Sequence, residues 1–393
     1  MKKRAAAPTS IPPPNPLPMI QNIQILRFVA ALLVTLHHAT PPIVWQIVYP
    51  QIPVLHQIAK IGFAGVDIFF VISGAIMAET TRQLQPGLRS AAGFAVKRFA
   101  RVYSGWWPVF LIFLALYLGS NAYEGQNINL LKSFLLLPQP LDAQLLPIVW
   151  TLVYELYFYL LVAVLLLCQR ATQLRILFLL GLTIATLTVA FAQQGIYSPD
   201  GLGRLPLLLE FACSPFLLEF IAGFLVCDWV RRHPQQPWLL WLAASLLFCI
   251  AAYLYQGSSL MRGPGMAGHF HYPERVMLFG IPACGFLAVA LCLPEPRSRP
   301  ALLAARLGDA SYSLYLTHLL ALRGMYTLMP LAPGLLGLWR HVPSYLLALL
   351  ACLVYAWIHY RLIERPLYRL SLRWLMPRAA APTTTDSATK APQ

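Results

Sequence analysis

The sequence predicts an all-α polytopic membrane protein, a bundle of about ten transmembrane helices with both chain ends in the cytoplasm. Hydrophobic residues make up 58% of the 393 residues and charged residues only 11%, whereas about 25% of an ordinary soluble domain is charged. Apolar runs of about 20 residues, enough to cross a bilayer core of about 30 Å, recur along the whole chain. Basic residues also gather on one side of the resulting topology.

The apolar runs divide the chain into one membrane domain and two tails. The membrane domain is predicted at residues 20–370, between a disordered cytoplasmic tail at 1–19 and a largely disordered cytoplasmic tail at 371–393, both rich in Pro and Ala. Helices are predicted near residues 20–40, 61–79, 103–121, 148–168, 174–193, 211–230, 238–256, 274–293, 311–330 and 344–363.

The charge distribution predicts the orientation. With the first helix running outward, 22 of the 29 Lys and Arg residues fall on the cytoplasmic side, where short loops retain basic residues. The net charge of +15 is therefore attributed to topology and not to a nucleic-acid partner.

Cysteine and histidine spacing indicates no metal site. The seven cysteines lie in or beside predicted spans without a CxxC pair, so we interpret them as small apolar residues. His269 and His271 form an HxH pair in an outer loop, but no third ligand is in view.

Ionisable residues inside predicted spans are candidate functional residues, because each costs about 2.5–3.5 kcal/mol to insert at mid-helix. Arg27 and His38 are separated by three helical turns and share one face of the first helix. His38 is suited to take a proton from a sugar hydroxyl. A histidine that only packs between helices, bonded to a carbonyl, is the competing interpretation, and it is favoured for His37.

Asp67 opens the second helix among apolar neighbours, and a buried carboxylate needs a partner. Arg27 or His38 on the preceding helix is the expected partner, in which case Asp67 would fix the tautomer of the histidine. A purely structural ion pair is the alternative.

Two further groups come from the third and fourth helices. Arg98 and Arg101, in a cytoplasmic stretch before the third helix, are three residues apart and could clasp a phosphate-bearing ligand, although topogenic charge explains such a pair equally well.

Glu155 lies among aromatic residues and is expected to bond Tyr159 one turn later. This pattern favours a polar cavity over an interfacial aromatic belt.

Other polar positions are less specific. Glu210 and Glu219 flank the sixth predicted helix. Tyr312, Tyr315 and His318 follow one another at spacings of three residues. Such a stripe would line a pore or pack as part of the core.

The order of these motifs resembles one family of membrane enzymes. Arg27 followed by His38, GVDIFFVISG, KRFARVY, WTLVYELYFY, SYSLYLTH and the IERP of Glu364 to Pro366 together resemble the acyltransferase-3 family, in its exopolysaccharide acetyl-transferring branch. One departure is Ser104, where the family usually has the proline of an Ile-Tyr-Pro string; here the proline is lost or displaced to Pro108. This departure leaves the start of the local helix open.

The resemblance implies an O-acyltransferase of the bacterial inner membrane that moves an acyl group, usually acetyl from acetyl-CoA, to a hydroxyl of a surface glycan or its lipid-linked precursor. His38 and Arg27 match the histidine and the arginine of the family's first motif. Arg98 and Arg101 match the paired arginines that meet the acyl donor, and Asp67 and Glu155 occupy the carboxylate positions.

The expected partners are therefore acyl-CoA, a glycan acceptor, membrane lipid and polysaccharide-assembly proteins, with no nucleic acid and no metal. A transporter or flippase is the main rival interpretation, because it also needs charged residues in its spans. No inverted repeat supports it. A third interpretation keeps the acyl transfer but changes the acceptor to a lipid, a peptide or a macrolide.

Overall fold

The structure is a computed structural model, and it describes residues 21–39, 58–120, 125–197, 205–256, 273–328 and 338–376. These residues form helices, with no strand among them, which confirms the all-α class. The predicted tail at 1–19 lies outside the described residues, as do His269 and His271 and all of the second tail after residue 376.

Eight helical segments within the described residues are long and apolar enough to cross a membrane. They run over Ile58–Thr81, Leu88–Gly119, Pro147–Leu165, Arg170–Gln193, Leu207–Arg232, Trp238–Tyr255, Pro273–Cys292 and Tyr345–Leu375. Two further predicted spans are also helical, each over 18 residues: α1 (Gln21–His38) and α14 (Ser311–Leu328). The total of ten spans and the orientation stay predictions.

Besides α1 and α14, the bundle contains helical elements that range from 3 to 32 residues in length. In chain order the others are η2 (Gly62–Ala64), α3 (Gly65–Thr81), α4 (Leu88–Gly119), α5 (Leu130–Leu135), η4 (Leu141–Ala143), η5 (Pro147–Val149), α6 (Trp150–Leu165), α7 (Arg170–Gln193), α8 (Leu207–Ala212), α9 (Phe216–Arg232), α10 (Trp238–Gln256), α11 (Pro273–Arg275), η7 (Val276–Gly280), α12 (Ile281–Cys292), α13 (Arg299–Asp309), α15 (Leu338–His359), η9 (Tyr360–Glu364) and α16 (Arg365–Leu375). The segments η7 and η9 are single π-helical stretches.

Helix α4 begins earlier than its apolar run predicts. The prediction that Arg98 and Arg101 lie before the helix was wrong, because α4 starts at Leu88 and contains both. Its first turns bury Ala91 and Phe94, so packing extends the helix beyond the apolar stretch. Pro108 lies inside α4 and does not mark its start, as neighbouring helices allow in membrane proteins.

Two amphipathic helices, α13 and α16, were not predicted because neither is apolar over the length of a span. α13 packs on α1, and α16 packs on α4. α16 extends to Leu375, past the boundary at residue 370.

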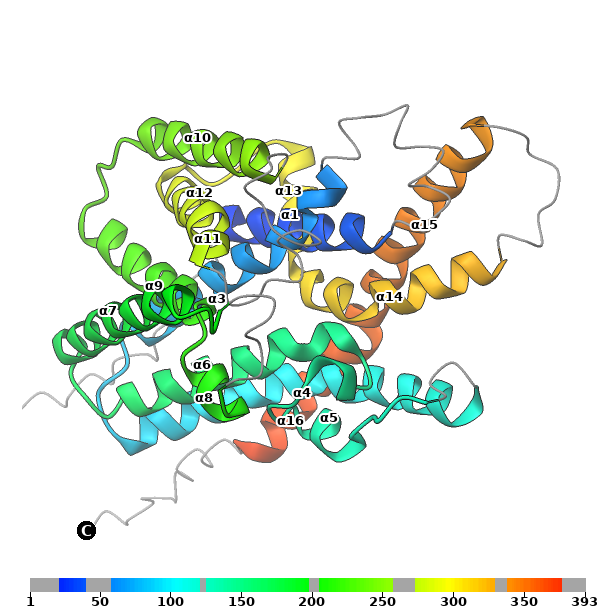
Figure 1. Cartoon of the computed structure of the whole chain (residues 1–393), viewed down its shortest axis with the longest axis horizontal. Helices are drawn as coiled ribbons and strands as arrows, with labels where there is room; N and C mark the ends of the chain where they lie inside the picture. Colours follow the sequence, from blue (N-terminus) through cyan, green and yellow to red (C-terminus); the bar gives the residue numbers. More distant parts are fainter. Residues whose placement is uncertain are drawn as a thin grey trace, which may run out of the picture.

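The core forms where α3 crosses α9. A methyl group on Gly74 would lie 2.0 Å from the carbonyl oxygen of Phe220, and one on Gly223 would lie 2.0 Å from that of Val71. The two backbones can approach this closely only because both positions are glycine. In Figure 1, α1 and α3 occupy the centre of the molecule, α7 and α9 lie to one side, α4, α6 and α16 lie below, and α14 and α15 lie on the other side.

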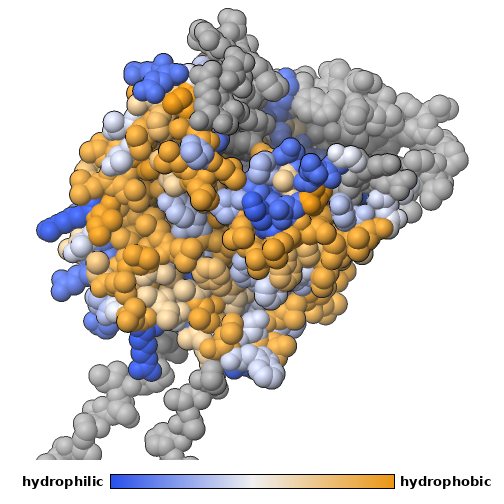
Figure 2. Space-filling model, turned by 60° about the horizontal axis from the view of Figure 1, so that its bottom comes forward, coloured by the Kyte–Doolittle hydropathy of each residue, from blue (hydrophilic) through white to orange (hydrophobic). Residues whose placement is uncertain are grey.

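The surface fits a bilayer environment. Figure 2 shows a face that is mostly apolar, with hydrophilic residues confined to small groups. Helices α7 and α10 are the most exposed of the candidate spans, with only 17% and 11% of their apolar windows buried. Apolar side chains on such faces are expected to meet lipid.

Candidate functional site

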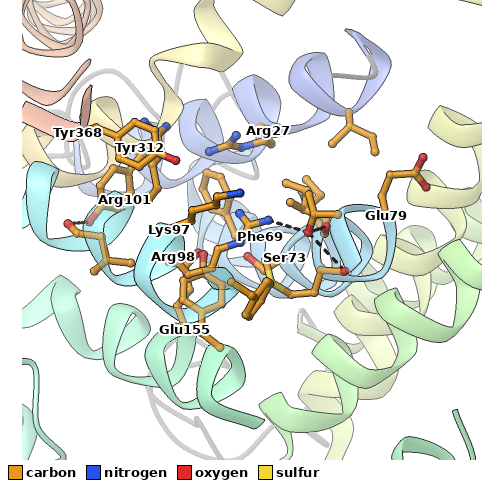
Figure 3. Close-up of a pocket in the computed structure, with 18 of the residues that line it drawn as sticks. Arg27, Phe69, Ser73, Glu79, Lys97, Arg98, Arg101, Glu155, Tyr312 and Tyr368 are labelled. Atoms are coloured by element: carbon orange, nitrogen blue, oxygen red, sulfur yellow. Dashed lines mark hydrogen bonds between the residues drawn. The ribbon is translucent and has the colours of Figure 1, made fainter. Parts of the chain in front are cut away.

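One cavity of about 1060 Å³ lies between α1, α3, α4, α6, α14 and α16. It brings together four of the six predicted site residues, listed here as Arg27, Arg98, Arg101 and Glu155. They come from three helices and surround the same space (Figure 3). His38 and Asp67 are not part of its lining.

The lining of this cavity is strongly basic. It holds seven Lys and Arg side chains against three Asp and Glu side chains. The basic ones are Arg27, Arg89, Lys97, Arg98, Arg101, Arg365 and Arg369. Arg89, Lys97 and Arg369 are exposed, so the cavity reaches the surface at its most basic end.

Arg98 is held by α3 and by two aromatic rings. Its Nη2 donates to Oγ1 of Thr80 at 2.8 Å. Its guanidinium carbon lies 5.4 Å from the ring centre of Phe94 and 5.7 Å from that of Tyr159, within the range of cation–π attraction. These contacts fix Arg98 in the cavity wall. Because the hydroxyl of Thr80 is neutral, the positive charge of Arg98 is not cancelled by this partner.

Arg101 is held by a buried acid, Glu364, which belongs to one of the family motifs in the sequence but was not predicted as a site residue. Nη1 of Arg101 lies 2.5 Å from Oε1 of Glu364, which is fully buried. Ser313 donates its hydroxyl to the other oxygen of Glu364, and Nδ1 of His359 lies 2.9 Å from Oγ of Ser313. Glu364 was not among the ionisable residues selected inside spans, because it falls one residue beyond the last predicted span. It lies at the end of η9, which places it next to Arg101 of α4.

Arg27 and Glu155 line the inner part of the cavity. Nη1 of Arg27 donates to Oε1 of Gln24 at 3.3 Å. The expected contact between Tyr159 and Glu155 is confirmed, with the tyrosine hydroxyl donating to the carboxylate. The acid is therefore part of a polar cavity and not of an interfacial belt.

His38 lies beyond an aromatic layer at the inner end of the cavity. Phe69 and Tyr315 line the cavity and contact each other edge to face, with ring centres 5.9 Å apart. The ring of His318 is 6.1 Å from that of Tyr315 and 5.0 Å from that of His38. Of the tyrosine–histidine stripe, the two tyrosines thus face the cavity and His318 lies behind them, next to His38.

Asp67 does not pair with Arg27 or His38, so that prediction was wrong. Arg275 donates to both carboxylate oxygens of Asp67, at 3.1 and 2.9 Å, and both side chains are buried. Arg275 lies inside a predicted span and is ionisable, so the rule that selected Asp67 could have found it. Its guanidinium also stacks on Phe63 and Phe216.

Comparison with known proteins decides the family. The family model for the acyltransferase domain, acyltransferase-3, matches residues 20–361. The chain belongs to this family. Among the described residues no group of three metal-ligating side chains is found.

Two curated relatives cover most of the chain. The exopolysaccharide production protein ExoZ of Rhizobium meliloti (strain 1021) is 27% identical over 325 residues, which is 79% of this chain and 90% of ExoZ. Acyltransferase MdmB of Streptomyces mycarofaciens is 27% identical over 370 residues, 86% of this chain and 88% of MdmB. No solved structure matches.

The family and the helices together identify a multi-pass membrane acyltransferase. A reaction of this class needs a donor site and a group that activates the acceptor. The basic cavity and the neighbouring rings of His38 and His318 lie in adjacent parts of one bundle.

Proposed function

We propose that the protein transfers an acyl group, acetyl in particular, from acyl-CoA to a hydroxyl of a surface polysaccharide or its lipid-linked precursor in the bacterial inner membrane. The observation that carries the proposal is the basic cavity, which joins Arg98 and Arg101 to Arg27. ExoZ is an exopolysaccharide production protein by name, which supports a glycan acceptor. The proposed orientation turns the basic end of the cavity toward the cytoplasm, where acyl-CoA is found.

The donor's phosphates are proposed to bind Arg98 and Arg101. Guanidinium groups bind phosphate oxygens with two parallel hydrogen bonds. Arg98 keeps an uncompensated charge beside Thr80, and Glu364 holds Arg101 in place. The exposed Arg89, Lys97 and Arg369 add positive potential at the mouth of the cavity, which attracts an anionic donor.

The thioester is proposed to lie near Arg27, whose guanidinium stabilises the negative charge that develops on the carbonyl oxygen. Glu155 accepts the hydroxyl of Tyr159 in the wall of the same cavity and is proposed to hold that ring in place. Asp67 is assigned a structural role, because its charge is matched by Arg275.

His38 is proposed as the general base. Its imidazole takes the proton of the acceptor hydroxyl, the oxygen forms a bond to the thioester carbonyl carbon, and the carbon–sulfur bond breaks. The CoA thiolate then takes the proton from the imidazolium and leaves as the free thiol. The donor must therefore reach past Phe69 and Tyr315, while the acceptor approaches from the opposite, extracytoplasmic side.

The experiment uses the full chain in lipid vesicles without any ion gradient. Purified protein with acetyl-CoA and lipid-linked host glycan is expected to release CoA thiol and to yield acetylated glycan, detected by mass spectrometry. His38→Ala should lose this activity. His233→Ala is the matched control, because His233 is exposed at the end of α9 and its Nδ1 also lies beside a backbone carbonyl, that of Trp229.

Three outcomes count against the proposal. Glycan movement without CoA release favours a transporter. Full activity of His38→Ala removes the proposed base. Acetylation of a lipid or a small molecule in place of the glycan changes the acceptor.

A further inference from the structure

His38 and His318 are in direct contact across α1 and α14. Nε2 of His318 lies 3.3 Å from Nδ1 of His38. The same Nδ1 of His38 lies 2.9 Å from the carbonyl oxygen of Val34. Nδ1 of His318 lies 2.7 Å from the carbonyl oxygen of Tyr315 and 3.2 Å from that of Leu314.

These contacts fix the protons on both rings. A carbonyl oxygen only accepts, so Nδ1 of His318 must carry hydrogen, and its Nε2 in the neutral ring is then an acceptor. By the same rule Nδ1 of His38 carries hydrogen, which it shares between Val34 and Nε2 of His318. The remaining nitrogen of His38, Nε2, therefore holds a lone pair.

We propose that His318 is a positioning residue that keeps His38 in the Nδ1–H tautomer and stabilises its imidazolium form during acyl transfer. This inference rests on the proposed function of His38 as the base. When Nε2 of His38 takes the hydroxyl proton, the ring becomes positive and its Nδ1–H bond to His318 becomes a charge-assisted one. An orienting carboxylate performs this task in serine hydrolases; here a buried neutral imidazole performs it.

The surroundings favour a neutral acceptor at this position. His318 is fully buried, so a permanent charge on it would be costly. Among the described residues, polar side chains close to the pair include those of His37 in α1, whose ring is 5.1 Å from that of His38, Tyr315 in α14, and Cys352 in α15, whose thiol lies 3.7 Å from the carbonyl oxygen of His318. None of these three is a carboxylate that could orient His38 in its place.

The test compares variants at His318 in the vesicle assay. His318→Met removes the acceptor atom at similar length and is expected to lower kcat about 10- to 1000-fold, with the KM for acetyl-CoA nearly unchanged. His318→Gln can place its amide oxygen where Nε2 was, and it should recover most of the rate. Thr317→Val is the matched control, because Thr317 is the neighbouring buried polar residue and its hydroxyl donates to the carbonyl of Ser313.

A second measurement needs no variant at His318. Ring ¹⁵N shifts of the folded wild-type protein in lipid, with the His38 signal identified by its loss in His38→Asn, should show a protonated Nδ1 and an unprotonated Nε2. The opposite tautomer would overturn the inference even if His318→Met failed to fold.

The outcomes separate this inference from the proposed function. Full activity of His318→Met beside an inactive His38→Ala overturns the role of His318 alone. An inactive wild-type protein, or an active His38→Ala, overturns both. If His318→Met and His318→Gln are both folded and both lose activity, then the shape of the imidazole matters and its acceptor atom does not. That result also overturns the proposed role of His318.

Discussion

Arg275 donates two hydrogen bonds to the carboxylate of Asp67, and the pair is buried where α11 meets α3. Removing one member of a buried ion pair leaves the other charge unpaired, which costs about 3–5 kcal/mol. We expect Arg275→Met to lower the melting temperature of the detergent-solubilised protein sharply. Thermal unfolding followed by intrinsic fluorescence measures the change.

Two further variants sharpen this prediction. Arg175→Met changes an exposed arginine of α7 and should leave the melting temperature close to that of the wild type. The double variant Asp67→Leu, Arg275→Met should recover part of the loss, because an apolar pair can replace a buried ion pair without net cost. A single variant at Arg275 that is as stable as the wild type would contradict the prediction.

The span positions and four cavity residues could be predicted from the sequence because both follow from local patterns. Apolar length locates a helix, and an ionisable residue within it indicates a polar interior. The partner of Asp67 could not be predicted in this way, because Arg275 is distant in the chain and only the packing of α11 against the bundle brings it close.

The ends of helices were harder to predict, and two site features depend on them. Arg98 lies inside α4 because packing extends that helix beyond its apolar run. Glu364 reaches Arg101 through η9, a π-helical stretch with no pattern in hydropathy. Interactions with distant helices decide such positions, and the sequence carries no periodic signal for them.

Arg98→Ala should weaken donor binding more than it changes stability. Arg98 bonds the neutral hydroxyl of Thr80, so its loss leaves no buried charge unpaired. Losing a charge-assisted hydrogen bond of about 1.5–3 kcal/mol corresponds to an increase of about 10- to 100-fold in the KM for acetyl-CoA. Initial rates at varied donor concentration measure this, and Arg175→Ala on exposed α7 serves as the control. An unchanged KM would remove Arg98 from the donor site.

Asp309→Asn should stabilise the protein at neutral pH. Burial raises the pKa of the Asp309 carboxyl above its ordinary value, against the attraction of Arg27, Arg101 and Arg365. An acid whose pKa is raised on folding contributes stability at low pH and loses it as the pH rises through the raised pKa. The melting temperature of Asp309→Asn should therefore exceed that of the wild type at about pH 7, and the difference should shrink toward about pH 4.

The same variant should bind the donor more tightly. Asp309 is one of three acidic side chains in the cavity lining, and its removal raises the positive potential there. With screening, one partly buried charge near the surface contributes about 0.5–1 kcal/mol, so the KM for acetyl-CoA should fall about two- to fivefold. Asp142→Asn changes an exposed acid outside the cavity. It should alter neither the melting temperature nor the KM for acetyl-CoA. A raised KM in Asp309→Asn would refute the electrostatic account of the cavity.

Gly74→Ala should destabilise the crossing of α3 and α9. The added methyl group would lie 2.0 Å from the carbonyl oxygen of Phe220 and 2.8 Å from the backbone nitrogen of Phe224. A backbone cannot turn away as a side chain can, so the helices must separate, and we expect a loss near the upper end of the range of about 1–3 kcal/mol that overpacking costs. Gly324→Ala meets nothing within 4 Å and should be neutral or stabilising by up to about 1 kcal/mol, since alanine favours a helix. Equal melting temperatures for the two variants would mean that α3 and α9 are not in the close contact described.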